Sequence, residues 1–167
     1  MNLIETQRLS IRKLVAEDAP FILELVNEPA FIKNIADRGV RNLDDARKYI
    51  ADGPITMYER YGFGLFAVEL KESGVPIGMC GLIKRDSLED VDLGYAFFER
   101  HWGQGYASEA AAAVIDYGRK TFGLKRIVAI TAQHNEGSIN VLKKMGFQFE
   151  KLITMPGETE EINFFAL

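Results

Sequence analysis

The sequence predicts a mixed α/β domain with about seven strands and about four helices. Short runs rich in β-branched and aromatic residues alternate with segments whose apolar residues recur at helical spacing. The chain has 167 residues, 47% of them hydrophobic, and no Pro- or Ser-rich linker or internal repeat divides it. This length and composition suit one hydrophobic core. We therefore expect residues 1–167 to form a single domain.

The N-terminal part is predicted to hold a strand and two helices. Leu9–Leu14 alternates apolar and polar residues like a half-buried strand. A helix follows with Asp18 and Pro20 in its first turn, where acidic residues and proline are favoured. Pro29–Ile35 is expected to add a short second helix.

A third helix is predicted to begin at Asn42 and to run to about Tyr58. Asn42 is a favourable N-cap because its side-chain oxygen can accept from the backbone N–H of Asp45. Gly53 and Pro54 are expected to kink this helix, since proline lacks the backbone donor and crowds the preceding turn.

Three strands are predicted next. Leu65–Leu70 and Ile77–Lys84 consist mostly of β-forming residues and are joined through Gly74, which predicts a hairpin. Val91–Phe98 reads as a buried strand, and a helix with recurring small and apolar residues begins near Ala107.

The last part of the chain is predicted to hold a strand, a helix and two strands. Arg126–Ala132 is the strand, and the helix after it begins near Asn135, which can cap it together with Ser138. The final strands are Phe147–Ile153 and Glu161–Ala166, which are joined by a Pro-Gly turn.

The junction at residues 100–109, which reads Arg-His-Trp-Gly-Gln-Gly-Tyr-Ala-Ser-Glu, is the most informative segment. Gly103 and Gly105 stand between a strand and a helix, where unpaired backbone N–H groups and the helix dipole favour an anion. A Walker loop would need a Lys after the second glycine, and a dinucleotide-binding loop would need a third small residue, for which Ser108 is a poor substitute. The spacing therefore predicts a different kind of phosphate loop.

This loop resembles the Gln/Arg-x-x-Gly-x-Gly/Ala signature of the GCN5-related N-acetyltransferase (GNAT) superfamily, with Arg100 in the first position. A second segment resembles the other cofactor-side motif of that family: Asn135, Ser138, an amphipathic helix and then Gly146-Phe147. The residues of both motifs resemble those of one branch in particular, the RimJ/RimL-like branch, which acetylates ribosomal-protein alanine and serine N-termini. The resemblance covers most of the chain.

The resemblance implies a central mixed sheet that is splayed between the fourth and fifth predicted strands to admit the pantetheine arm of acetyl-CoA. Acetyl-CoA is the expected co-substrate, and no metal is expected because two His and one Cys make no metal-ligand spacing. The residues that the resemblance places at acetyl-CoA are Phe97, Phe98, Arg100, His101, Gly103, Gln104, Gly105, Tyr106, Ala107, Asn135 and Ser138.

Transfer to a neutral amine requires a group that takes a proton and a donor for the leaving thiolate. Asp92, on the strand that leads to the loop, is the first candidate base, ahead of Glu89 and Asp90; each is also a plausible surface carboxylate. The best-known family pattern has a Tyr seven residues after the motif Asn, but Leu142 stands there. Ser138 is therefore the candidate donor to the thiolate.

The acceptor is predicted to be a primary amine, either a protein N-terminal α-amine or a small molecule such as a polyamine, aminoglycoside or amino acid. The predicted acceptor loops are Phe31–Arg41, Tyr58–Gly64 and Thr154–Glu160. The acidic stretch around Glu89 would attract a basic acceptor, or is a solvated loop. The alternative class is a non-catalytic, regulatory acyl-CoA-binding domain.

Composition limits the other partners. A formal net charge of −4 argues against a nucleic-acid binder, and no apolar run is long enough for a membrane span. Cys80 stands without a second cysteine in an apolar strand and reads as a buried structural thiol. We expect a cytoplasmic protein, since no signal peptide is recognisable, and either a monomer or a homodimer.

Overall fold

A computed structural model describes residues 2–167 and places eight strands in one sheet. The strands are β1 (Asn2–Glu5), β2 (Leu9–Lys13), β3 (Leu65–Leu70), β4 (Pro76–Ile83), β5 (Val91–Phe97), β6 (Ile127–Thr131), β7 (Gln148–Thr154) and β8 (Glu161–Ala166). The α-helices are α1 (Ala19–Val26), α2 (Pro29–Asn34), α3 (Leu43–Ile50), α4 (Thr56–Tyr61), α5 (Tyr106–Phe122) and α6 (Glu136–Lys144). All seven predicted strands are present, and β1 is an additional one.

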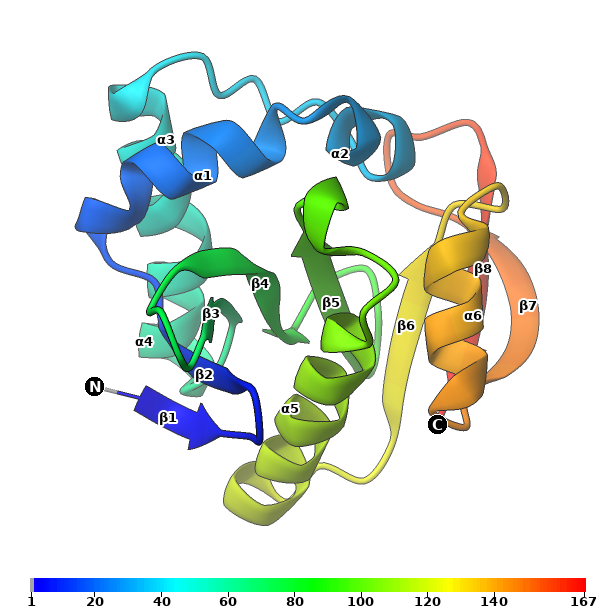
Figure 1. Cartoon of the computed structure of the whole chain (residues 1–167). Helices are drawn as coiled ribbons and strands as arrows, with labels where there is room; N and C mark the ends of the chain where they lie inside the picture. The colour runs from blue at the N-terminus through cyan, green and yellow to red at the C-terminus, as the bar shows by residue number, and fades with distance from the viewer. Residues whose placement is uncertain (1) are drawn as a thin grey trace.

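The sheet order is β1-β2-β3-β4-β5-β6-β8-β7. Every neighbouring pair is antiparallel except β5 and β6, which are parallel. Figure 1 shows α5 and α6 on the same side of the sheet, with β6 visible between them. The mixed sheet agrees with the predicted fold class.

The split in the sheet lies between β5 and β6. Strand β5 pairs with β4 along its length, from Asp92 to Phe97, but it pairs with β6 only at Val91 and Asp92. Beyond Asp92 the edge of β5 that faces β6 has no ladder partner among residues 2–167. The fourth and fifth predicted strands are therefore splayed, as expected.

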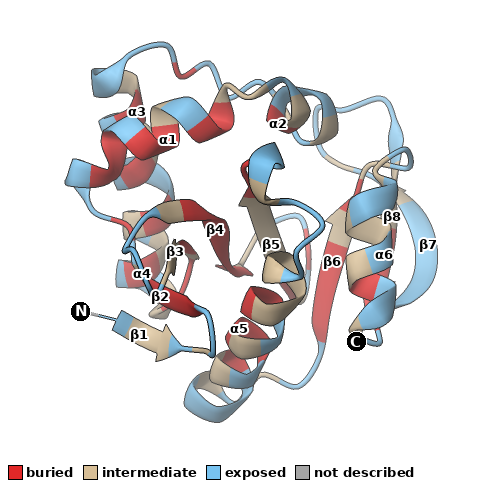
Figure 2. Cartoon of the chain, viewed as in Figure 1, coloured by how far each residue is buried: buried red, intermediate tan, exposed pale blue. Residues whose placement is uncertain are grey.

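Two hydrophobic clusters cover the two faces of the sheet's centre. Side chains of α5 such as Val114 pack with Leu93 and Phe97 of β5 on one face. Side chains of α1 such as Ile22 pack with Met79 and Ala96 on the other. Figure 2 shows buried residues along the central strands and along one side of α1, with exposed residues on the outer strand β7. Because successive side chains alternate across a strand, each residue of β5 is assigned to one face.

The predicted third helix is observed as α3, a π-helical segment at Ala51–Ile55, and α4. Asn42 Oδ1 accepts from the Asp45 amide at 2.8 Å, so Asn42 is the predicted N-cap. Pro54 lies inside the π-helical segment. The wider turn accommodates the proline, which removes a donor and clashes with the carbonyl four residues earlier. Within residues 2–167 no helix has both the length and the apolar character that crossing a membrane requires.

Candidate active site

The loop between β5 and α5 has the geometry of an anion site. Gly103 and Gly105 have φ of 76° and 82°, a region that favours glycine. No hydrogen bond within residues 2–167 uses the amides of Gly103 through Ala107 as donors. A Cβ on Gly103 would meet open space, so the loop faces outward. These free N–H groups at the N-terminus of a 17-residue helix fit a pyrophosphate.

The turn between β1 and β2 braces this loop from the side. Arg8 donates from Nη1 to the Gln104 carbonyl at 2.9 Å and from Nε to Glu109 Oε1 at 2.7 Å. Its guanidinium also lies 4.4 Å from the centre of the Tyr106 ring. Glu109 further accepts from Thr6 Oγ1 at 2.6 Å. Sequence reasoning did not find this brace, since about a hundred residues separate its partners and no local spacing signals the contact.

The predicted cofactor residues before the glycines lie in two environments. Phe97 and Phe98 are 7% and 1% exposed and lie in the clusters on opposite faces. Their backbones are also hydrogen-bonded, because the Phe97 carbonyl accepts from Trp102 Nε1 at 2.9 Å and the Phe98 amide donates to the Ile77 carbonyl at 3.0 Å. Arg100 donates to Glu24 at 3.2 Å and lies over the Phe98 ring, which turns it toward α1. The His101 ring packs edge-on against that of Tyr106 at the loop itself.

The N-terminus of α6 faces β5 across the split. Asn135 is the N-cap of α6 and accepts from the Ser138 amide at 3.3 Å. The Ser138 hydroxyl lies 2.7 Å from the phenol oxygen of Tyr95, which belongs to β5. Leu142 is fully buried, where the better-known family pattern has its phenol. Tyr95 therefore brings a phenol to Ser138 from a different element, and sequence reasoning missed it because strand position alone does not reveal the contact.

Asp92 lies at the closed end of the split and is 1% exposed. It forms an ion pair with Arg85, Nε to Oδ1, at 3.1 Å. Burial raises the pKa of the Asp92 carboxyl to about 6, while the charge and hydrogen bond of Arg85 oppose that rise. A carboxyl with a pKa in this range can exchange a proton at neutral pH.

Asp92 and Ser138 reach the split from opposite faces of the sheet. Tyr95, which contacts Ser138, shares the α5 face with Leu93 and Phe97. Asp92 alternates with these residues and therefore points to the face that carries α1. Among the other acidic candidates, Asp90 pairs with Arg126 at 3.0 Å.

The comparisons with known proteins agree with this architecture. Residues 8–148 match the model of the acetyltransferase (GNAT) domain. The chain belongs to the GNAT acetyltransferase family. It is 32% identical over 154 residues to the uncharacterized N-acetyltransferase p20 of Bacillus licheniformis, with 92% of this chain and 86% of that protein covered.

Two further similarities are to enzymes named for the acetylation of ribosomal proteins. The [ribosomal protein uS5]-alanine N-acetyltransferase of Escherichia coli is 31% identical over 102 residues, which cover 59% of this chain and 52% of that enzyme. The structure of RimL, a ribosomal L7/L12 α-N-protein acetyltransferase in complex with coenzyme A, superposes with a TM-score of 0.85 at 18% identity, covering 100% and 97% of the two chains. The second similarity establishes the shared fold.

Enzymes of this family use acetyl-CoA to acetylate amines, and the free amides of the glycine loop fit its pyrophosphate. Among residues 2–167, no group of three or more His, Cys, Asp or Glu side chains is placed to hold a metal ion. Cys80 is fully buried, and burial raises the pKa of its thiol, which suits a structural residue.

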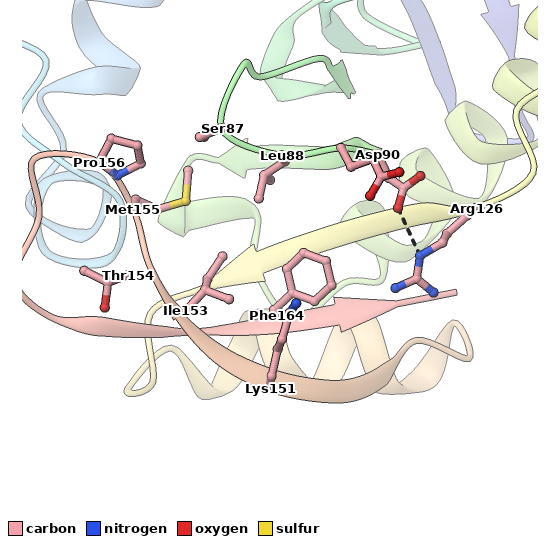
Figure 3. A pocket seen from close by; sticks show the side chains of 11 residues that line it. Ser87, Leu88, Asp90, Arg126, Lys151, Ile153, Thr154, Met155, Pro156 and Phe164 are labelled. Carbon is pink, nitrogen blue, oxygen red and sulfur yellow. Dashed lines mark hydrogen bonds and ion pairs between the residues drawn. The ribbon is translucent and has the colours of Figure 1, made fainter.

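A groove of about 520 Å³ lies on the face of β6, β8 and β7 that carries Phe164. Figure 3 shows Leu88, Ile153 and Met155 toward its interior and the Asp90–Arg126 ion pair at one end. Thr154 and Pro156, from the predicted acceptor loop at 154–160, also line it. The groove is thus bounded by both the acidic stretch before β5 and the turn between β7 and β8.

Proposed function

We propose that this acetyltransferase moves an acetyl group from acetyl-CoA to a protein N-terminal α-amine. The free backbone N–H groups of the glycine loop are the observation that supports an acetyl-CoA site. In it, the pyrophosphate lies on the amides of residues 103–107, and the pantetheine arm runs along the unpaired edge of β5, beyond Asp92. Asn135 at the start of α6 holds the amides of that arm from the other side of the split.

The open groove and one relative support a protein acceptor. A polypeptide terminus needs an extended surface, and we assign this role to the groove beside the β7–β8 turn, whose lining includes Asp90, two residues before the candidate base Asp92. The relative named a ribosomal-protein alanine N-acetyltransferase matches 59% of this chain. In the acidic stretch, Asp90 and Asp92 are each paired with an arginine, which leaves Glu89, in the lining of the groove, as the carboxylate that could attract a basic acceptor.

The chemistry assigns one role to each side of the split. The amine nitrogen attacks the thioester carbon, the N–C bond forms and the C–S bond breaks. Asp92 takes a proton from the nitrogen, on the face that carries α1, and the Ser138 hydroxyl donates to the departing sulfur on the α5 face. The proton removed from the amine returns to the thiolate through solvent, so the products are an amide and a thiol.

Calorimetry with acetyl-CoA, followed by thiol release in the same sample, tests the proposal. The acceptors are peptides with free N-termini, the same peptides with blocked N-termini, and a panel of polyamines, aminoglycosides and amino acids. Thiol release that requires a free peptide N-terminus supports a protein acceptor. Release only with small amines would overturn that acceptor, and release with none of them would favour the regulatory alternative.

Two glycine variants test the donor site. Gly105→Glu places bulk and negative charge at the pyrophosphate position and is expected to abolish acetyl-CoA binding. Gly74→Glu is the matched control, because Gly74 has a similar φ of 73° in the β3–β4 turn and no neighbour near its Cβ position. Loss of binding in both variants would indicate general misfolding, and retained binding in Gly105→Glu would refute the loop assignment.

A further inference from the structure

The contact between Tyr95 and Ser138 joins the two elements that bound the split. Tyr95 extends from β5, and its phenol oxygen lies 2.7 Å from Ser138 Oγ and 3.1 Å from the Ser138 carbonyl oxygen, both in the first turns of α6. No other side-chain hydrogen bond within residues 2–167 links β5 to α6. The hydroxyl of Ser138 is therefore oriented by a residue outside its own helix.

The chemistry of the two hydroxyl groups favours one direction for this hydrogen bond. A phenol is a stronger acid than a serine hydroxyl and is therefore the better donor. The distance of 2.7 Å to Oγ is the usual O–H···O distance, and it is shorter than the distance to the carbonyl. The phenol has one proton, which can go either to the Ser138 carbonyl oxygen at 3.1 Å or to Oγ at 2.7 Å. In the second, shorter arrangement the proton of Ser138 is free to point elsewhere.

We propose that Tyr95 is a positioning residue that donates to Ser138 Oγ and thereby directs the serine proton toward the sulfur of the departing thiolate. This inference rests on the proposed function. Tyr95 itself touches no reacting atom. The C–S bond breaks, its electron pair stays on sulfur, and the hydrogen bond from Ser138 stabilises that charge, while Tyr95 keeps its own proton throughout.

The surroundings of Tyr95 suit this role. Its ring packs in the apolar cluster beneath α5, and its Cα pairs with that of Cys80 in the adjacent strand. Burial raises the pKa of the Tyr95 phenol to about 12, against the opposing effect of the Ser138 hydrogen bond. The phenol is therefore protonated at neutral pH and serves as a fixed donor on a rigid strand.

Three variants test the proposal: Tyr95→Phe, Ser138→Ala and the double variant. Removal of one oriented hydrogen bond is expected to lower kcat about tenfold in Tyr95→Phe, while the Kd of acetyl-CoA changes less than about twofold. The double variant should turn over no more slowly than Ser138→Ala, because Tyr95 acts only through the serine.

Tyr117→Phe is the matched control. Tyr117 packs in the same apolar cluster, and its phenol makes no side-chain hydrogen bond within residues 2–167. Its turnover should equal that of the unmodified enzyme. The melting temperatures of Tyr95→Phe and Tyr117→Phe should agree within about 5 °C, so that a loss of kcat is not a loss of fold.

The outcomes separate this inference from the proposed function. A normal kcat in Tyr95→Phe with a reduced kcat in Ser138→Ala would overturn the role of Tyr95 and leave the function intact. Independent, multiplicative losses in the double variant, or a loss of kcat matched by weaker acetyl-CoA binding, would show a structural role instead. Unchanged turnover in Ser138→Ala would remove the serine from the mechanism and Tyr95 with it.

Discussion

Removal of the Arg8 side chain is expected to weaken acetyl-CoA binding, because Arg8 fixes the loop that is proposed to hold the pyrophosphate. Arg8 holds the Gln104 carbonyl and the first turn of α5 through Glu109, and it lies over Tyr106. These contacts hold the loop at Gln104 and at Glu109, and so fix the direction of the backbone N–H groups that lie between these two residues. Without these contacts the loop must become ordered when acetyl-CoA binds, and the entropy lost in this ordering weakens the binding free energy.

The expected size of the effect follows from the contacts. A hydrogen bond to a charged group contributes about 1.5–3 kcal/mol when it is well shielded. Arg8 is 42% exposed, so solvent reduces the value of its pair with Glu109 to the range of about 1 kcal/mol or less. Glu109 also keeps its bonds from Thr6 Oγ1 and from the Arg8 amide. With the Gln104 contact included, we expect a total of about 1–2 kcal/mol, or a Kd about tenfold higher in Arg8→Ala.

Calorimetric titration of Arg8→Ala, Arg8→Lys and Arg47→Ala with acetyl-CoA measures this effect. Arg47 forms an exposed pair with Asp44 on α3 and serves as the control, with no change expected. Lysine restores the charge of Arg8 but not its two-pronged geometry. Equal weakening in Arg8→Ala and Arg8→Lys supports the brace. Full recovery in Arg8→Lys would refute the reasoning, because charge alone would then account for the effect.

Three further predictions concern stability. The pKa of Asp92 is raised to about 6 in the folded state, so the folded protein holds this proton more tightly than the unfolded chain does. The free energy of unfolding should therefore fall by about 3 kcal/mol as the pH rises from about 4 to about 6. Asp92→Asn should abolish this fall, because asparagine does not titrate. Thermal melts of both proteins across this range measure the difference, and parallel curves would contradict it. Gly81→Ala should destabilise by about 3 kcal/mol or more in urea unfolding, because a Cβ there would lie 1.9 Å from the Gly64 carbonyl oxygen; a change below about 1 kcal/mol would mean that the strands yield easily. Asn42→Ala should cost about 1 kcal/mol in the same assay through loss of the N-cap, whereas Asn42→Asp should cost little.

Local signals in the sequence predicted most elements of the fold. Glu161–Ala166 is observed with its predicted bounds, Asn42 caps its helix, and the predicted hairpin forms. Each depends on residues that are near one another in the chain. Strand β1 was not predicted, since it has only four residues and its pairing with β2 is interrupted by a bulge. So short an edge strand carries almost no periodicity of its own.

The candidate site was predictable in part for the same reason. The glycine loop and the cap of α6 are local patterns, and the structure gives the loop the expected free amides. The contacts of Arg8 with Glu109 and of Tyr95 with Ser138 join residues 101 and 43 positions apart. Contacts of that range depend on how strands pair and helices pack, and no spacing within one segment specifies them.

The split between β5 and β6 explains how groups on opposite faces of a sheet can serve one reaction. A continuous ladder would separate the side chains of one face from those of the other by the backbone itself. Here the ladder ends at Asp92, and Tyr95, three residues further along β5, already borders the opening together with α6. A thioester in that opening would present its sulfur to the face that carries Ser138 and its carbonyl carbon to an amine from the other face. The parallel pairing of β5 with β6 at only two positions is therefore the feature of the fold on which the proposed chemistry depends most directly.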